Sequence, residues 1–219
     1  MDRWATFDCY GTLIDWNEGI GSVLARLFGD EHRERLLARY HQLEPEVEHD
    51  GYRTYRNVLD LVVARIAQEE GRALGPGEQT AMSESLAGWQ AFADVPDSLA
   101  ELRKRGWRLG ILSNCDRDLV ASSIPRLGVR FDEVVVAEDV RSYKPAPGHW
   151  EEFRRRTGVG PERHVHVAQG LFHDIAPSNE LGLRSVWINR LAERSGPRPT
   201  RELPDLTGLA DVLDDLVAE

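Results

Sequence analysis

The sequence predicts an α/β fold, with a doubly wound, mainly parallel sheet and an inserted helical subdomain. Short apolar runs of strand length alternate with segments of helix length, which is the pattern of βαβ units. The strands of such a sheet are covered by helices on both faces, so they form nearly continuous apolar runs. One long stretch, residues 16–93, has no strand signal and interrupts the alternation.

Five segments fit the predicted strands, because each is a short run rich in apolar and β-branched residues. They are residues 4–7, 109–112, 133–137, 164–168 and 184–188. Helices are predicted between most of them, and a closing helix follows a Gly-Pro-Arg-Pro loop at residues 196–199. These helices are residues 96–105, 117–127, 149–157, 176–181 and 208–217.

Residues 16–93 fit several helices, because their apolar residues recur at helical spacing in two stripes. A glycine-rich break at residues 71–77 precedes a last helix that ends near Trp89. We therefore expect a core domain formed by residues 1–15 and 94–219, and a cap formed by residues 16–93. The stripes are Leu24, Leu27, Leu36, Leu37, Tyr40 and Leu43, and Tyr55, Val58, Leu59, Val62, Val63 and Ile66.

Net charge, apolar runs and cysteine content exclude several classes of partner and site. The formal net charge of −10 disfavours nucleic acid and anionic membrane surfaces as partners, but leaves a small anionic substrate open. No apolar run approaches membrane-spanning length. The two cysteines, Cys9 and Cys115, form neither a disulfide framework nor a metal-ligand cluster. The first predicted strand begins at once, without room for a signal peptide, so we expect a cytoplasmic protein.

Polar residues with catalytic potential stand at or after the carboxyl ends of the predicted strands. Ligands bind at that edge in open α/β sheets. Each of these short patterns alone would be weak, but here they occur in order along one chain. They are Asp8, the pair Ser113-Asn114, Lys144 in Ser-Tyr-Lys-Pro-Ala-Pro, and Asp174 in Gln-Gly-Leu-Phe-His-Asp.

In order and spacing, these four elements resemble the motifs of the haloacid dehalogenase superfamily, over nearly the whole chain. The resemblance implies a Rossmann-like core with a helical cap, and Asp8 as a nucleophile. Position 10 then distinguishes the branches. Phosphatase members resemble Asp-x-Asp-Gly-Thr, where the second carboxylate protonates the leaving alkoxide and the first helps to hold Mg²⁺. Here Tyr10, a poor acid at neutral pH, takes the second place.

The segment around Tyr10 therefore resembles the L-2-haloacid dehalogenase branch, which implies a reaction without metal or cofactor on a small carboxylate substrate. A halide leaves as a stable anion and needs no proton donor. The cap segment Ala-Arg-Tyr-His-Gln-Leu-Glu resembles the dehalogenase helix whose arginine contacts the substrate carboxylate and the departing halide. That gives the role to Arg39, with Leu43 one turn later lining an apolar pocket. The alternative for Arg39 is an ordinary solvated arginine.

The resemblance implies a displacement in two steps. Asp8 attacks C2 of a 2-haloacid and forms an aspartyl ester, and water then releases a 2-hydroxy acid of inverted configuration. Lys144 would keep Asp8 ionised. Asp174 would pair with Lys144, or cap a helix.

Three further polar residues are expected to serve this reaction. Thr12 and Ser113 would hydrogen-bond the nucleophile or the substrate carboxylate, or cap turns. Asn114 would donate to the halide, or close a turn.

The fourth motif departs from the family. Well-known dehalogenases resemble Ser-Ser-Asn-Ala-Trp-Asp, with a serine and an asparagine that order the hydrolytic water. Leu171 in this chain cannot position water. We therefore expect His173 to activate the water, oriented by Glu18, although His173 could equally be a half-exposed histidine at a helix start. Trp150 stands near the place of a family tyrosine that faces the site, which predicts a small aromatic pocket for short substrates such as haloacetates.

Three other functions stay open from the sequence. A phosphatase of the same fold would need a metal and a second acid. A hydrolase that opens a strained ring at C2 of a carboxylic acid, such as azetidine-2-carboxylate, would use Asp8 and Arg39 equally well. A binding module without activity is disfavoured, because the nucleophile and Lys144 are intact. A homodimer is possible, since dimers are common among the enzymes that the chain resembles.

Overall fold

A six-stranded sheet forms the centre of the computed structural model, which describes residues 2–49, 51–194 and 196–218. The strand order is β3-β2-β1-β4-β5-β6, and every neighbouring pair is parallel. The predicted α/β class is therefore confirmed. The strands are β1 (Trp4–Phe7), β2 (Arg108–Ser113), β3 (Glu133–Val136), β4 (His164–Ala168), β5 (Arg184–Ile188) and β6 (Arg201–Leu203).

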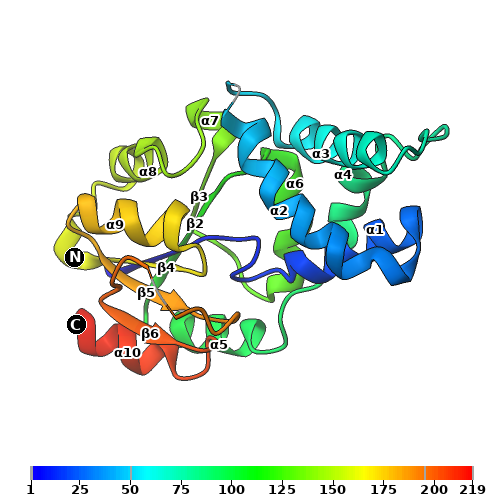
Figure 1. Cartoon of the computed structure of the whole chain (residues 1–219). Coiled ribbons are helices and arrows are strands. Elements are labelled where there is room, and N and C mark those ends of the chain that lie inside the picture. The colour runs from blue at the N-terminus through cyan, green and yellow to red at the C-terminus, as the bar shows by residue number, and fades with distance from the viewer. Residues whose placement is uncertain (1, 50, 195, 219) are drawn as a thin grey trace.

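Helices cover both faces of the sheet, with α8 and α9 on one face and α5 and α10 on the other (Figure 1). The strands alternate accordingly. Trp4 and Leu112 pack with Phe153 of α8, whereas Phe7 and Ile111 belong to the larger core on the opposite face. The helices of this layer are α5 (Val95–Lys104), α6 (Arg117–Ser123), α7 (Ala137–Val140), α8 (Gly148–Thr157), α9 (Ala176–Glu180) and α10 (Leu209–Leu216).

Packing against α8 explains the glycine inside β2. A Cβ atom at Gly110 would lie 2.7 Å from the ring of Phe153 and 3.1 Å from the methyl group of Thr6. Phe153 is fully buried, so neither neighbour can give way cheaply. Gly110 thus lets α8 and the sheet approach closely. The same face of the sheet carries the polar residues that support Lys144.

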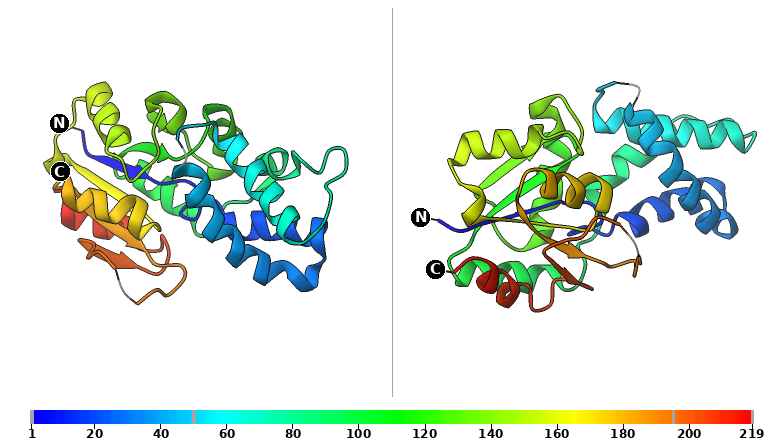
Figure 2. Two further views of the ribbon diagram at one scale, coloured as in Figure 1. Left: turned by 45° about the horizontal axis from the view of Figure 1, so that its top comes forward. Right: turned by 60° about the vertical axis from the view of Figure 1, so that its left-hand side comes forward.

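The remaining helices form a separate layer beyond the carboxyl ends of the strands, which we call the cap (Figures 1 and 2). The cap begins after Asp15. The Asp15 carboxylate accepts a hydrogen bond from the backbone N–H of Glu18 at 3.0 Å and so caps the first helix. Within the described residues, no helix combines the length and apolar character that crossing a bilayer requires. The cap elements are α1 (Trp16–Phe28), η1 (Asp30–His32), α2 (Arg33–His49), α3 (Tyr55–Glu69), α4 (Ala81–Ser85) and η2 (Leu86–Gly88).

The strand order places the functional edge of the sheet. From β1, the chain builds the sheet outward in one direction through β2 and β3, and then in the other direction through β4, β5 and β6. The position between β1 and β4, where the direction changes, is a switch point, and ligands bind in the crevice there. Asp8 directly follows β1, Asn114 follows β2, and Asp174 lies in the turn after β4. These ends converge beneath the cap.

Candidate active site

Asp8 is held at the end of β1 by its backbone and by two side chains. Its backbone N–H donates to Val167 O at 3.1 Å and so continues the ladder to β4. The Nζ of Lys144 donates to Oδ1 at 2.9 Å, and the hydroxyl of Thr12 donates to Oδ2 at 2.8 Å. The carboxylate therefore has one fixed orientation, with both oxygens engaged.

Lys144 lies 1% exposed in the loop before α8 and uses all three of its N–H donors. They reach Asp8 Oδ1, Asp174 Oδ1 at 2.6 Å and Leu112 O at 2.9 Å. Asn114 fixes the lysine backbone, because its Nδ2 donates to Lys144 O at 3.0 Å and its Oδ1 accepts from Lys144 N at 2.6 Å. The ammonium thus bridges two buried carboxylates.

Burial and charge act in opposite directions on these groups. Burial raises the pKa of Asp8 above its ordinary value, and Lys144 and Thr12 only partly offset it. Burial would also raise the pKa of Asp174, but the charge of Lys144 and a hydrogen bond from His166 hold it well below the usual range. Burial would lower the pKa of Lys144, but the two carboxylates raise it. Lys144 stays charged, and Asp174 is its permanent partner.

A buried polar row supports Asp174 from beneath. His166 Nε2 lies 2.9 Å from Asp174 Oδ1, its Nδ1 lies 2.9 Å from Thr6 Oγ1, and that oxygen lies 2.7 Å from His164 Nε2. One order of donation satisfies every contact: His164 to Thr6, Thr6 to His166, and His166 to Asp174. The row orients Asp174.

A cavity of about 90 Å³ opens above Asp8, which is room for about three water molecules. The core supplies its floor and the cap supplies its roof. The hydroxyl of Ser113, a residue 1% exposed, has no hydrogen-bond partner among the described residues. The lining residues are Asp8, Tyr10, Ser113, Asn114, Lys144, Gln169, Gly170, His173 and Asp174 from the core, and Trp16, Glu44, Glu48 and Tyr55 from the cap.

The backbone beside Asp8 offers further donors. The N–H groups of Cys9 and Tyr10 make no hydrogen bond in the described part of the chain, although Cys9 is fully buried. Buried backbone donors are nearly always satisfied, so unpaired ones beside a cavity suit an anionic ligand.

The structure corrects the expected place of Arg39, which does not line the cavity. Its guanidinium faces α3, where Nη2 and Nε bind the carboxylate of Glu69 at 2.6 and 2.9 Å, and the side chain is 36% exposed. The physical reason is helical rotation, since Tyr40, the next residue, turns inward instead and is fully buried. Leu43 is also displaced: it packs in the hydrophobic core and does not line the cavity.

The expected pair of Glu18 and His173 does not form either. Glu18 lies on the outside of α1, bound to Ser22 and Arg33. His173 does line the cavity, in the single π-helical turn Leu171–Ile175, and burial lowers its pKa. Trp150 lies behind the site, with its ring 5.4 Å from that of His166, and does not reach the cavity.

Tyr10 contributes to the site through its ring and backbone, because its hydroxyl points away. The hydroxyl lies 3.1 Å from Ser123 Oγ and 3.3 Å from Leu119 O, on α6. Its ring packs edge-on against Trp89. Thr12, Ser113, Asn114, Lys144 and Asp174 all surround Asp8 as described above.

Sequence reasoning missed the cap carboxyls Glu44 and Glu48. A signal was present, because Tyr40, Glu44 and Glu48 follow one another at four-residue spacing and so share a helix face. It also missed Gly170, where a Cβ atom would lie 2.6 Å from Asp174 Oδ2. Only glycine allows the chain to leave β4 so close to that carboxylate.

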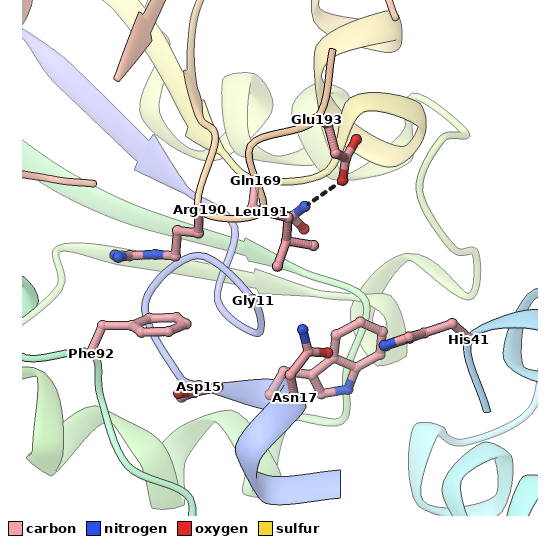
Figure 3. A pocket seen from close by; sticks show the side chains of 10 residues that line it. Gly11, Asp15, Asn17, His41, Phe92, Gln169, Arg190, Leu191 and Glu193 are labelled. Atoms are coloured by element: carbon pink, nitrogen blue, oxygen red, sulfur yellow. Dashed lines mark hydrogen bonds between the residues drawn. The ribbon is translucent and has the colours of Figure 1, made fainter. Parts of the chain in front are cut away.

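A larger cavity of about 490 Å³ (Figure 3) shares Trp16 and Gln169 with the first cavity and so lies next to it. Gln169 Nε2 donates to Glu193 at 3.3 Å across its rim. Arg190 lies in its wall with the guanidinium 3.8 Å from the ring centre of Phe92. That guanidinium is engaged by Asp94 and by Thr12 O, so it braces the turn that positions the Thr12 hydroxyl.

Cationic chemistry at the site comes from Lys144. Among the described residues, no three His, Cys, Asp or Glu side chains converge as a metal-binding group. The space between Asp8 and Asp174 is bridged by the lysine ammonium, which does not suit a second cation there. The arrangement can present an oriented carboxylate to a small electrophile.

Comparisons with known proteins agree with this geometry. The model of the haloacid dehalogenase-like hydrolases matches residues 3–179. Over 216 residues the chain is 25% identical to the (S)-2-haloacid dehalogenase of Pseudomonas sp. (strain YL), covering 95% of this chain and 93% of that one. Over 170 residues it is 31% identical to the glyceraldehyde 3-phosphate phosphatase of Methanopyrus kandleri, covering 76% and 72%.

A solved structure shares the fold. It is the L-2-haloacid dehalogenase from Xanthobacter autotrophicus with chloropropionic acid covalently bound. The TM-score is 0.86 at 19% identity, and the match covers 97% of this chain and 98% of that one.

Proposed function

The chain belongs to the haloacid dehalogenase-like hydrolases, and we propose that it hydrolyses short 2-haloalkanoic acids through an ester at Asp8, without a metal ion. The observation that best supports this proposal is the environment of Asp8. Lys144 and Thr12 hold both carboxylate oxygens at the floor of a small cavity, and the Tyr10 hydroxyl is turned away from it. A nucleophile without an acid at position 10 suits a leaving group, such as a halide, that needs no proton.

In this proposal the substrate carboxylate binds without an arginine. The free Ser113 hydroxyl and the unpaired N–H of Tyr10 lie on the core side of the cavity, and the unpaired N–H of Cys9 directly follows Asp8 in the chain. Together they offer three donors for one carboxylate, as backbone nests do for other anions. C2 is then presented to Asp8, and the cavity volume of about 90 Å³ favours substrates of two or three carbons.

The chemistry then runs in two steps. A carboxylate oxygen of Asp8 forms a bond to C2 as the carbon–halogen bond breaks, and the halide leaves with the electron pair. Water next attacks the ester carbonyl, which returns Asp8 and releases the 2-hydroxy acid. His173 is the candidate base for this water, because burial lowers its pKa and keeps the ring neutral at pH 7. Glu18 has no part in this step.

Halide release tests the proposal. Chloro-, bromo- and fluoroacetate and both 2-chloropropionate enantiomers are assayed with EDTA present, and p-nitrophenyl phosphate is assayed with Mg²⁺. We expect halide release that EDTA does not reduce. Arg39→Gln is a matched control that should leave KM unchanged, because the Arg39 side chain is bound to Glu69. Phosphate release alone, dependent on Mg²⁺, would establish the phosphatase function instead.

Replacing His173 with Ala should separate the two steps. We expect a burst of halide equal to the enzyme concentration, followed by turnover slowed about 10²-fold or more, because the ester forms but its water lacks a base. Mass spectrometry of the quenched enzyme should detect the modified Asp8 peptide. Glu18→Gln is the control and should behave as wild type. Unchanged steady-state turnover in the His173 variant would remove this residue from the mechanism.

A further inference from the structure

Two cap carboxyls face the nucleophile from the roof of the cavity. Glu44 and Glu48 are one helical turn apart on α2, and both line the same space as Asp8. Glu44 is 8% exposed, and its Oε1 accepts the hydroxyl of Tyr55 at 2.8 Å and that of Tyr40 at 3.4 Å. Glu48 has no hydrogen bond or ion pair to any described residue.

The cavity offers these two carboxyls one counter-charge, Lys144, whose attraction lowers the pKa of Glu48 less than burial raises it. Lys144 is the only lysine or arginine among the described residues that line it, and its three N–H donors are all used. A carboxyl that is largely removed from water holds its proton to higher pH when the nearest cation is engaged by other groups. Burial raises the pKa of Glu44 to about 7, and burial together with Glu44 raises the pKa of Glu48 to about 9. At neutral pH, Glu48 is therefore a carboxylic acid with one O–H to donate.

A second feature independently indicates that a ligand belongs between roof and floor. The Ser113 hydroxyl opens onto the same cavity without a hydrogen-bond partner, although only 1% of the residue is exposed to solvent. A ligand bound there through its carboxylate would lie between Asp8 and the cap acids. The substituent that leaves C2 on the side opposite Asp8 would then point toward the cap.

This inference rests on the proposed function. We propose that Glu48, backed by Glu44 and facing Asp8 across the cavity, donates a proton to the group that leaves C2. The chain would then also open strained cyclic ethers that carry a carboxylate on the reacting ring carbon. Halides need no such proton, whereas a ring oxygen leaves poorly without one.

The step balances as the addition of one water. An Asp8 oxygen forms a bond to C2 while the bond from C2 to the ring oxygen breaks. The ring atom takes the electron pair and the proton of Glu48. Water then hydrolyses the ester at its carbonyl, and the proton that it releases restores Glu48. Oxirane-2-carboxylate would give 2,3-dihydroxypropanoate.

Parallel assays on two substrates test the inference. Ring opening of oxirane-2-carboxylate and chloride release from 2-chloropropionate are measured for wild type, Glu48→Gln and Glu46→Gln. Glu46 is the matched control, since it lies exposed on the same helix, 3.5 Å from Arg65. We expect Glu48→Gln to lower kcat for ring opening about 10²-fold or more, and for chloride release far less. Glu46→Gln should change neither.

The pH profile gives a second readout. The groups that face the pair are Tyr40 on α2, Tyr55 on α3, and Asp8, Tyr143 and Lys144 from the core. Ring opening should fall as the pH rises through about 9, where Glu48 loses its proton, while chloride release should not.

Three outcomes overturn the inference. Equal losses on both substrates in Glu48→Gln would mean that Glu48 acts only on structure or binding. Chloride release without ring opening by the wild-type protein would remove the inference and leave the proposed function intact. Failure on both substrates would overturn the proposed function and the inference together.

Discussion

Replacing Asp8 with Asn is expected to reduce halide release by about 10⁴-fold or more, to the level of the uncatalysed reaction. The amide has nearly the same shape but cannot displace a halide and form the ester. Lys144 keeps two of its three acceptors, Asp174 and Leu112 O, so the loop before α8 should stay in place. We therefore expect a folded, inactive protein with a Tm close to that of wild type.

The pH dependence of the wild-type protein checks the same assignment. If Asp8 is the nucleophile proposed above, it must be ionised to attack, and burial raises its pKa above the ordinary value. Activity on a haloacid should thus rise with pH, and its acid limb should lie at a higher pH than an ordinary aspartate would give. Halide release by ion chromatography and thermal unfolding provide the measurements. An Asp8→Asn variant that turns over many times at the wild-type rate would contradict Asp8 as nucleophile.

The core side of the site could be predicted from sequence because strand ends converge by topology. In a parallel sheet, the carboxyl ends of β1, β2 and β4 meet at one edge, so Asp8, Asn114 and Asp174 had to be neighbours. No detail of packing was needed for that conclusion. The same logic explains why strands β1, β4 and β5 begin and end where their apolar runs do.

The cap side could not be predicted in the same way. A helix turns by about 100° per residue, so placing Arg39 rather than Tyr40 on the inner face depends on how α2 rotates against its neighbours. The buried side chains of α2, Leu36, Tyr40 and Leu43 among them, fix that rotation, and Arg39 then binds Glu69 of α3 at the surface. Glu44 and Glu48 were overlooked because glutamates on a helix usually lie on its solvated face.

Two other elements were hidden by their local sequence. His164 and His166 alternate with valines inside an apolar strand, and only the neighbouring Thr6 on β1 reveals that they form a hydrogen-bonded row. Strand β6 has only three residues, two charged and one leucine, at the sheet edge, and is too short and polar to stand out from a loop. Both depend on partners that are distant in the sequence.

Lys144→Met should damage stability and activity together. Met has a similar length but leaves Asp8 and Asp174 buried without their shared cation, a loss of about 3–5 kcal/mol for a broken buried pair. At about 2–4 °C per kcal/mol for a chain of this size, Tm should fall by roughly 10 °C. Asp8 would also hold its proton to higher pH, so halide release at neutral pH should fall about 10²-fold or more.

The double variant Lys144→Met/Asp174→Asn separates those two effects. Removing the second carboxylate ends the repulsion with Asp8, and His166 can still donate to the amide oxygen of Asn. Tm should therefore recover most of the loss, because no unpaired anion remains beside Asp8. Activity should stay low, because nothing then favours the ionised form of the nucleophile. Recovery of halide release along with Tm would show that Lys144 serves only the fold, and that Asp8 reaches its reactive state without it.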